Sequence, residues 1–155
     1  MTVEMQEIAE QVEAGFQPRT VAFLCNWNAW SGAEAAGLSR KGYPANISLI
    51  RLQCLGRIHS GLILKAFEYG ADGVILVGCG SGSCRYHWGT DRAGEAFEQT
   101  RQLVRLLGLE DERLALAWVS PAAGETFSQK ITAFVENIRR LGRSPLATSP
   151  NGREP

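Results

Sequence analysis

Four short runs rich in apolar and β-branched residues alternate along this chain with longer segments of helical periodicity. Turn-forming residues bound each run. The runs span residues 20–25, 46–52, 72–78 and 114–120. The helical segments span residues 31–41, 59–69, 89–108 and 123–141. Strands that alternate with helices in this way are typical of a parallel sheet that is covered by helices on both faces.

The alternation predicts a single α/β domain with about four parallel strands, of the flavodoxin-like or Rossmann-like kind. Right-handed crossovers and one switch in the direction of strand addition give the strand order 2-1-3-4. The 155 residues of the chain suffice for one such domain. We expect it at residues 19–142, between an N-terminal extension (1–18) and a disordered tail (143–155) that holds three of the six prolines.

The last helical segment has the clearest pattern. Arg139 and Arg140 lie in its final turn, where cations suit the helix dipole, and Gly142 provides the stop. One apolar stripe is formed by Phe127, Ile131, Phe134, Val135, Ile138 and Leu141. This segment is therefore expected to pack one face against the sheet.

Charge and hydropathy exclude several classes of protein. The 16 basic and 16 acidic residues cancel, which gives no electrostatic indication of a nucleic-acid partner. No apolar run approaches the roughly 20 residues of a membrane span. The first residues are acidic and lack the order of a signal peptide, so we expect a cytoplasmic protein. Its four cysteines should then be free, bind metal or serve redox chemistry.

The four cysteines all follow predicted strands. Cys25 ends the first strand, and Cys54 lies two residues beyond the second. Cys79 begins the turn after the third strand, and Cys84 ends that turn. Because the carboxyl ends of parallel strands share one edge of the sheet, where ligands bind in such folds, we predict that these cysteines form one site.

Several ligands suit four thiolates at one edge. An iron–sulfur cluster takes four cysteines with varied spacing, whereas zinc usually takes Cys-x2-Cys pairs, which this sequence lacks. The glycines around Cys79 and Cys84 could aim backbone N–H groups at sulfur or at phosphate. The turn matches neither phosphate-loop pattern, however, since GCGSGSC has no lysine and no third glycine at the required spacing.

Other residues near the cysteines have two interpretations. Trp27, Trp30, Tyr86 and Trp88 could simply pack at the rim, or could shield a cofactor and contact a partner. Of the two histidines, His87 is close enough to Cys84 to be an alternative cluster ligand.

These residues resemble a known family, the delta subunits of methyl-viologen-reducing hydrogenase, small iron–sulfur subunits linked to heterodisulfide reductase. The resemblance spans roughly residues 20–142. The matching stretches are CNW (25–27), IRLQCLGR (50–57), LKAFEYGADGVILVGC (64–79), GSCRY around Cys84, and AWVSPAAGETF (117–127).

The resemblance implies an electron-transfer subunit of anaerobic metabolism that carries a 2Fe–2S cluster, with the chemistry done elsewhere in the complex. Electrons would pass from a hydrogenase or formate dehydrogenase to a flavin-containing heterodisulfide-reductase subunit, or to another oxidoreductase built on that flavoprotein. The cluster ligands implied here are Cys25, Cys54, Cys79 and Cys84. No general base or nucleophile–base pair is evident, so the chain by itself is not expected to be an enzyme.

The sequence departs from the family at two positions. Its first motif is usually Cys-Asn-Trp-Cys, and here Asn28 takes the last position; the family's Cys-His pair is replaced by Cys84 and Arg85. Either the missing cysteine is dispensable, or it is a ligand in the family, in which case the cluster here is lost, rearranged or completed by another group such as His87 or Asn28. We expect a retained cluster, whose potential Arg57 and Arg85 raise because reduction adds negative charge.

Three other functions stay open on the sequence alone. The chain could be a docking protein without a cluster, with four free thiols. It could be a thiol or persulfide carrier that uses Cys79 and Cys84. A zinc site is the remaining alternative.

Overall fold

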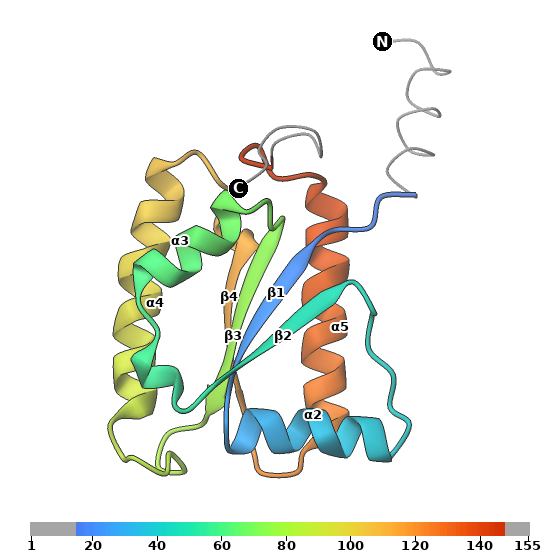
Figure 1. Ribbon diagram of the computed structural model, residues 1–155, viewed down its shortest axis with the longest axis vertical. Coiled ribbons are helices and arrows are strands. Elements are labelled where there is room, and N and C mark those ends of the chain that lie inside the picture. Colours follow the sequence, from blue (N-terminus) through green and yellow to red (C-terminus); the bar gives the residue numbers. More distant parts are fainter. Residues whose placement is uncertain (1–14, 148–155) are drawn as a thin grey trace.

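A four-stranded, all-parallel sheet forms the centre of the protein in the computed structural model, which describes residues 15–147 (Figure 1). Its order is β2-β1-β3-β4, as predicted. The strands are β1 (Thr20–Cys25), β2 (Ile47–Leu52), β3 (Gly73–Cys79) and β4 (Leu114–Val119). Each lies within one residue of its predicted bounds. All residues of β3 are buried, because its apolar run is covered on both faces.

Two helices cover each face of the sheet (Figure 1). On one face lie α2 (Asn28–Leu38) and α5 (Gly124–Leu141), and on the other α3 (Ser60–Glu68) and α4 (Gly89–Leu106). Short 3-10 helices precede α3 and β4: η1 (Leu55–Arg57) and η2 (Asp111–Arg113). The predicted stripe of α5 is confirmed, with Leu141 half-buried and its other members buried, and Gly142 ends the helix with φ 77°.

Helix α2 begins three residues earlier than predicted. Its N-cap, Trp27, provides no side-chain hydrogen bond. Instead the Sγ of Cys25 accepts a hydrogen bond from the backbone N–H of Ala29, at 3.3 Å. A cysteine sulfur thus performs the role that a serine or aspartate oxygen performs in an ordinary cap.

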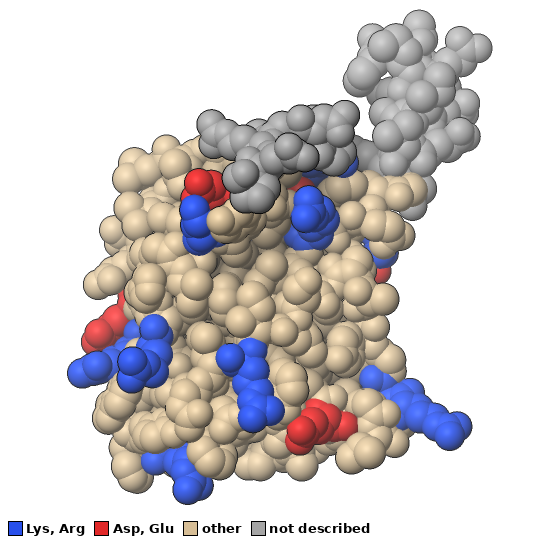
Figure 2. Space-filling model, viewed as in Figure 1, with Lys and Arg blue, Asp and Glu red and all other residues tan. Residues whose placement is uncertain are grey.

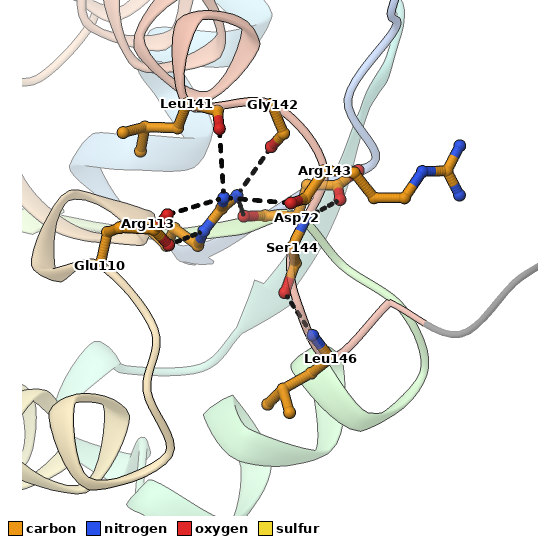
Figure 3. A network of polar contacts seen from close by, with 8 residues as sticks. All are labelled: Asp72, Glu110, Arg113, Leu141, Gly142, Arg143, Ser144 and Leu146. Atoms are coloured by element: carbon orange, nitrogen blue, oxygen red, sulfur yellow. Dashed lines mark hydrogen bonds and ion pairs between the residues drawn. The ribbon is translucent and has the colours of Figure 1, made fainter.

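The amino ends of β3 and β4 are joined to the chain's last described residues by a buried polar network (Figure 3). Arg113, 1% exposed, donates to the carbonyls of Asp72 and Gly142. The Asp72 carboxylate in turn accepts the backbone N–H groups of Arg19 and Ser144, both at 2.8 Å. Residues 143–147 of the predicted tail therefore have a defined place on the domain.

The remaining terminal predictions lie outside the described residues. These are residues 1–14 of the predicted N-terminal extension (1–18) and the expected disorder of residues 148–155. Among residues 15–147, no helix combines the length and the apolar content needed to cross a membrane.

Candidate functional site

The four cysteines meet at one small cavity at the carboxyl edge of the sheet. Cys25 and Cys79 end β1 and β3, Cys54 precedes η1, and Cys84 lies in the β3–α4 loop. All four are buried. The cavity between them has a volume of about 10 Å³. It is also lined by Trp27, Leu55, Tyr86, Gly89, Thr90 and Trp118. The predicted convergence of the cysteines is confirmed.

The sulfurs form two pairs. The Sγ atoms of Cys25 and Cys79 are 3.5 Å apart, because β1 and β3 are neighbouring strands. Cys54 and Cys84 form the second pair: both sulfurs lie against Gly89, where an added Cβ would be 2.4 Å from the first and 2.8 Å from the second, and each thiol shifts the pKa of the other. Cys79 therefore has Cys25, rather than Cys84, as its hydrogen-bonded sulfur partner. Among residues 15–147, no three His, Cys, Asp or Glu side chains converge as ligands for one metal ion.

Backbone N–H groups lie beside the sulfurs. Cys25 accepts from Ala29, as described, and Cys54 accepts from Gly56 at 3.4 Å. The backbone of Asn28 lies close enough to Cys79 to lower the pKa of its thiol. The backbone groups of Tyr86, Gly89 and Thr90 act in the same way on Cys84. The first turns of α2, η1 and α4 thus surround the cavity with donors that favour negatively charged sulfur.

The environment shifts the pKa values of three thiols. Burial raises the pKa of Cys79 to about 12, with Cys25 acting in the same direction. Burial also raises the pKa of Cys54, although the Gly56 N–H opposes it. Burial would raise the pKa of Cys84 as well, but its three backbone donors and Cys54 together bring it below the usual value. Cys84 is therefore the thiol that most readily becomes a thiolate.

We predict that iodoacetamide modifies Cys84 before Cys79 in the reduced, metal-free protein at neutral pH. The thiolate is the reactive form, so a lowered pKa increases its fraction and a raised pKa depletes it. Peptide mass mapping after timed alkylation gives the order. The urea-unfolded chain is the control, because its thiols should lose these differences. Faster modification of Cys79 would contradict the assigned environments.

Neither alternative ligand lines the cavity. His87 is exposed, with φ 64°. Asn28 is buried, and its side-chain amide donates to Ser83 Oγ and to the carbonyl of Val119, both at 3.2 Å. Asn28 therefore fastens the glycine-rich loop to the end of β4. The structure thus gives Asn28 a positioning role and leaves the four cysteines as the thiol set.

Of the four aromatic residues predicted to surround the cysteines, two line the cavity and two do not. Trp27 and Tyr86 line the cavity, whereas Trp30 binds Glu34 through its Nε1, and Trp88 is 44% exposed. The Nε1 of Trp27 is buried and has no hydrogen-bond partner among the described residues. An unpaired buried donor beside four thiols indicates a missing acceptor.

Four cavity residues were not predicted: Leu55, Gly89, Thr90 and Trp118. Trp118 is the penultimate residue of β4, opposite Gly78 in the register, and Gly89 is the first residue of α4. Both positions could have been found. Trp118 lies at the same strand edge as Cys79, and Gly89 opens the predicted helix that follows Cys84.

Comparison with known proteins agrees with the resemblance. Residues 20–142 match the family model described as methyl-viologen-reducing hydrogenase, delta subunit. The chain is 38% identical over 131 residues to the iron–sulfur subunit of the vhc F420-non-reducing hydrogenase of Methanococcus voltae, covering 84% of this chain and 91% of that protein. It is 38% identical over 127 residues to the F420-non-reducing hydrogenase iron–sulfur subunit of Archaeoglobus profundus, covering 82% and 93%.

A longer relative contains the same domain as one part. The chain is 38% identical over 144 residues to a large subunit of the ferredoxin:CoB-CoM heterodisulfide reductase of Methanosarcina mazei. The alignment covers 90% of this chain but only 18% of that protein. A domain of this kind therefore occurs both as a separate protein and within a larger polypeptide.

Proposed function

Because this chain belongs to the family of delta subunits of methyl-viologen-reducing hydrogenase, we propose that it is an electron-transfer component of a hydrogenase or heterodisulfide reductase complex. We propose further that Cys25, Cys54, Cys79 and Cys84 hold a 2Fe–2S cluster. The observation that carries this proposal is the meeting of four buried thiols at one cavity, in two pairs. Relatives of similar length are named iron–sulfur subunits.

The paired arrangement suits two metal atoms better than one. A 2Fe–2S cluster takes four thiolates, two on each iron. Two thiolates on one tetrahedral metal, with bonds of about 2.3 Å, have sulfurs roughly 3.8 Å apart. The Cys25–Cys79 separation of 3.5 Å is close to that value. A single zinc ion would need all four sulfurs to converge, and among residues 15–147 not even three ligands do so.

The surroundings also suit an anionic sulfur-rich group. Backbone N–H groups donate to Cys25 and Cys54, others lie beside Cys79 and Cys84, and the unpaired Nε1 of Trp27 is a further donor. A cavity of about 10 Å³ holds only one water-sized sphere. Binding of two irons and two sulfides therefore requires the sulfurs to separate. We propose that the exposed glycine-rich loop around Gly82 moves outward to allow this.

Such a cluster takes up and releases one electron. The chain's own residues hold it through thiolates, lower the cost of its negative charge with backbone donors, and exclude water with Trp27, Leu55 and Trp118. The sulfurs lie at the edge of the sheet, and Tyr86 and the exposed Trp88 lie between them and the surface. An electron would therefore travel only a short distance from the cluster to a docked partner.

The proposed partners follow from the relatives. The domain's presence within a heterodisulfide reductase polypeptide of Methanosarcina mazei supports direct contact with a protein of that kind. The acceptor we propose is a flavin-containing, heterodisulfide-reductase-like protein. The donor we propose is a hydrogenase or formate dehydrogenase, or another oxidoreductase. The setting we propose is cytoplasmic.

Iron and acid-labile sulfide analysis of anaerobically purified protein tests the cluster. We expect about two irons and two sulfides per chain, with a reddish-brown visible spectrum. Cys25→Ser and Cys54→Ser, one from each pair, should each lose most of the iron, whereas the loop variant Ser81→Ala should keep it. Zinc in place of iron, or colourless protein with four titratable thiols, would refute the cluster; the second result would leave a docking protein.

Trp27→Phe is predicted to lower the midpoint potential of the bound group without loss of iron. The substitution removes the Nε1 donor while retaining most of the ring, and a hydrogen bond to sulfur favours the more negative, reduced state. Trp30→Phe is the matched control, because the Nε1 of Trp30 already binds Glu34 at 2.9 Å. Spectroscopic redox titration of both variants decides. Equal potentials would show that Trp27 serves only as packing.

A further inference from the structure

Two arginines at the mouth of the cavity are stacked on tryptophan rings. The guanidinium of Arg85 lies 4.1 Å from the ring centroid of Trp27, which lines the cavity. That of Arg92 lies 4.6 Å from the ring centroid of Trp88. Both arginines are exposed. Stacking restricts each side chain while leaving its charge at the surface, so the charges are held in place before any partner arrives.

These arginines are joined to the thiol site by a continuous aromatic layer. Tyr86 lines the cavity, and its ring packs on Trp88 with centroids 6.2 Å apart. Its hydroxyl accepts a hydrogen bond from Gln53, the residue before Cys54, at 2.8 Å. Arg85 follows Cys84 directly in the chain. Arg85 therefore contacts the cavity lining directly, through Trp27, and Arg92 is separated from it by one side chain, that of Trp88.

Neither arginine forms an ion pair with another described residue, and the nearest acidic residue in the sequence is Asp91, beside Arg92 in the first turn of α4. Among residues 15–147, the cations that form ion pairs are Lys65, Arg101, Arg105, Arg113 and Arg139. Arg51 and Arg57, which flank Cys54 in the sequence, are likewise exposed and outside those pairs. Figure 2 shows more blue than red toward the lower end of the molecule, where the strands end. A chain of zero net charge thus carries a local excess of positive charge.

We propose that this cationic mouth, defined by Arg85 and Arg92 on their tryptophans, docks the acidic face of a redox partner protein. The proposal rests on the proposed function, since it assigns the partner's surface chemistry. The arginines would steer an acidic face toward the cavity, and Trp88, 44% exposed, would give a flat apolar contact at its centre. Like charge would disfavour a basic partner.

Electron transfer to two protein probes of opposite charge tests the proposal. The dithionite-reduced protein is mixed by stopped flow with plastocyanin, which is acidic, or with cytochrome c, which is basic. We expect the plastocyanin rate to fall with added salt, and to fall at least about threefold in Arg85→Gln/Arg92→Gln at low salt. The cytochrome c rate should rise in that variant. Arg140→Gln, at the far end of α5, is the control. A plastocyanin rate indifferent to salt and to the double variant overturns the proposal.

A second measurement needs no bound group. The thiols of the reduced, metal-free protein are treated with methanethiosulfonate reagents that carry a negative or a positive charge. The ratio of the two rates reports the local potential, because the thiolate fraction cancels. We expect the anionic reagent to be favoured, and the ratio to fall severalfold in the double variant. An unchanged ratio overturns the cationic mouth, whereas absence of iron refutes only the cluster.

Discussion

Arg113→Ala is expected to lower the free energy of unfolding by about 3–5 kcal/mol. The side chain is 1% exposed and its guanidinium donates to four backbone carbonyls, in addition to its ion pair with Glu110. These acceptors belong to Asp72, Leu141, Gly142 and Arg143. Truncation would leave buried carbonyls unpaired, and each costs about 1–3 kcal/mol. Since domains are stable by about 5–15 kcal/mol, roughly a fifth or more of the free energy of unfolding would be lost.

Urea unfolding followed by circular dichroism gives the value. Arg113→Lys is the partner variant, because an ammonium keeps the charge but cannot reach carbonyls on several sides, and its loss should be smaller. Arg105→Ala is the control, since it removes the exposed ion pair with Asp111, which is worth at most about 1 kcal/mol. Equal losses for Arg113→Ala and Arg105→Ala would contradict the role of the network. If Arg113→Ala does not fold, the loss of unfolding free energy in Arg113→Lys can still be compared with that in Arg105→Ala, and it should be the larger of the two.

The network also predicts which segment loosens first when Arg113 is replaced. Arg113 and Asp72 together hold the end of α5 and the segment that follows it, through the carbonyl of Gly142 and the N–H of Ser144 (Figure 3). Proteolysis of the lysine variant should therefore begin in residues 143–147. The same contacts give residues 143–147 a place on the domain that their composition does not indicate. Their serine and proline content is typical of disorder, but their order comes from groups more than 70 positions earlier in the chain, such as Asp72.

The sheet could be predicted because its causes are local and repeated. Each strand is an apolar run between turn residues, and right-handed crossovers leave few orders for four parallel strands. The predicted order already makes β1 and β3 neighbours. The pairing of Cys25 with Cys79 was therefore available from the sequence. The second pair was not, because Cys54 and Cys84 lie in loops whose paths no periodicity determines.

Two features of the structure were not predicted, because each depends on contacts that form only in the folded protein: the burial of Arg113 and the early start of α2. Arg113 stands in the charged run LEDER, which resembles a solvated turn, and only the tertiary structure encloses it. The early start of α2 escaped prediction because its cap is a sulfur, that of Cys25, rather than a typical capping oxygen. In both cases the contact that determines the local structure cannot be recognised from the spacing or type of the neighbouring residues.

Gly89→Ala is expected to prevent assembly of the proposed iron–sulfur site. An added Cβ would lie 2.4 Å from the Sγ of Cys54 and 2.8 Å from that of Cys84. Nor can the helix easily retreat from η1, since a Cβ on Gly56 would in turn meet the Cα of Gly89 at 2.7 Å. The backbones touch here, so the methyl group must displace a sulfur. Overpacking of this kind costs about 1–3 kcal/mol, which a domain can survive.

Iron content and thermal unfolding, measured together, separate the site from the fold. We expect Gly89→Ala to retain its circular dichroism spectrum and to lose most of its iron. Gly94→Ala lies in the same helix with nothing within 4 Å of its added Cβ, so it should keep its iron and gain up to about 1 kcal/mol of stability. Normal iron in Gly89→Ala would mean that Cys54 and Cys84 do not share a metal site against this backbone. Loss of iron in that variant alone would place the second pair of ligands there, because the two glycines differ chiefly in what their added methyl groups meet.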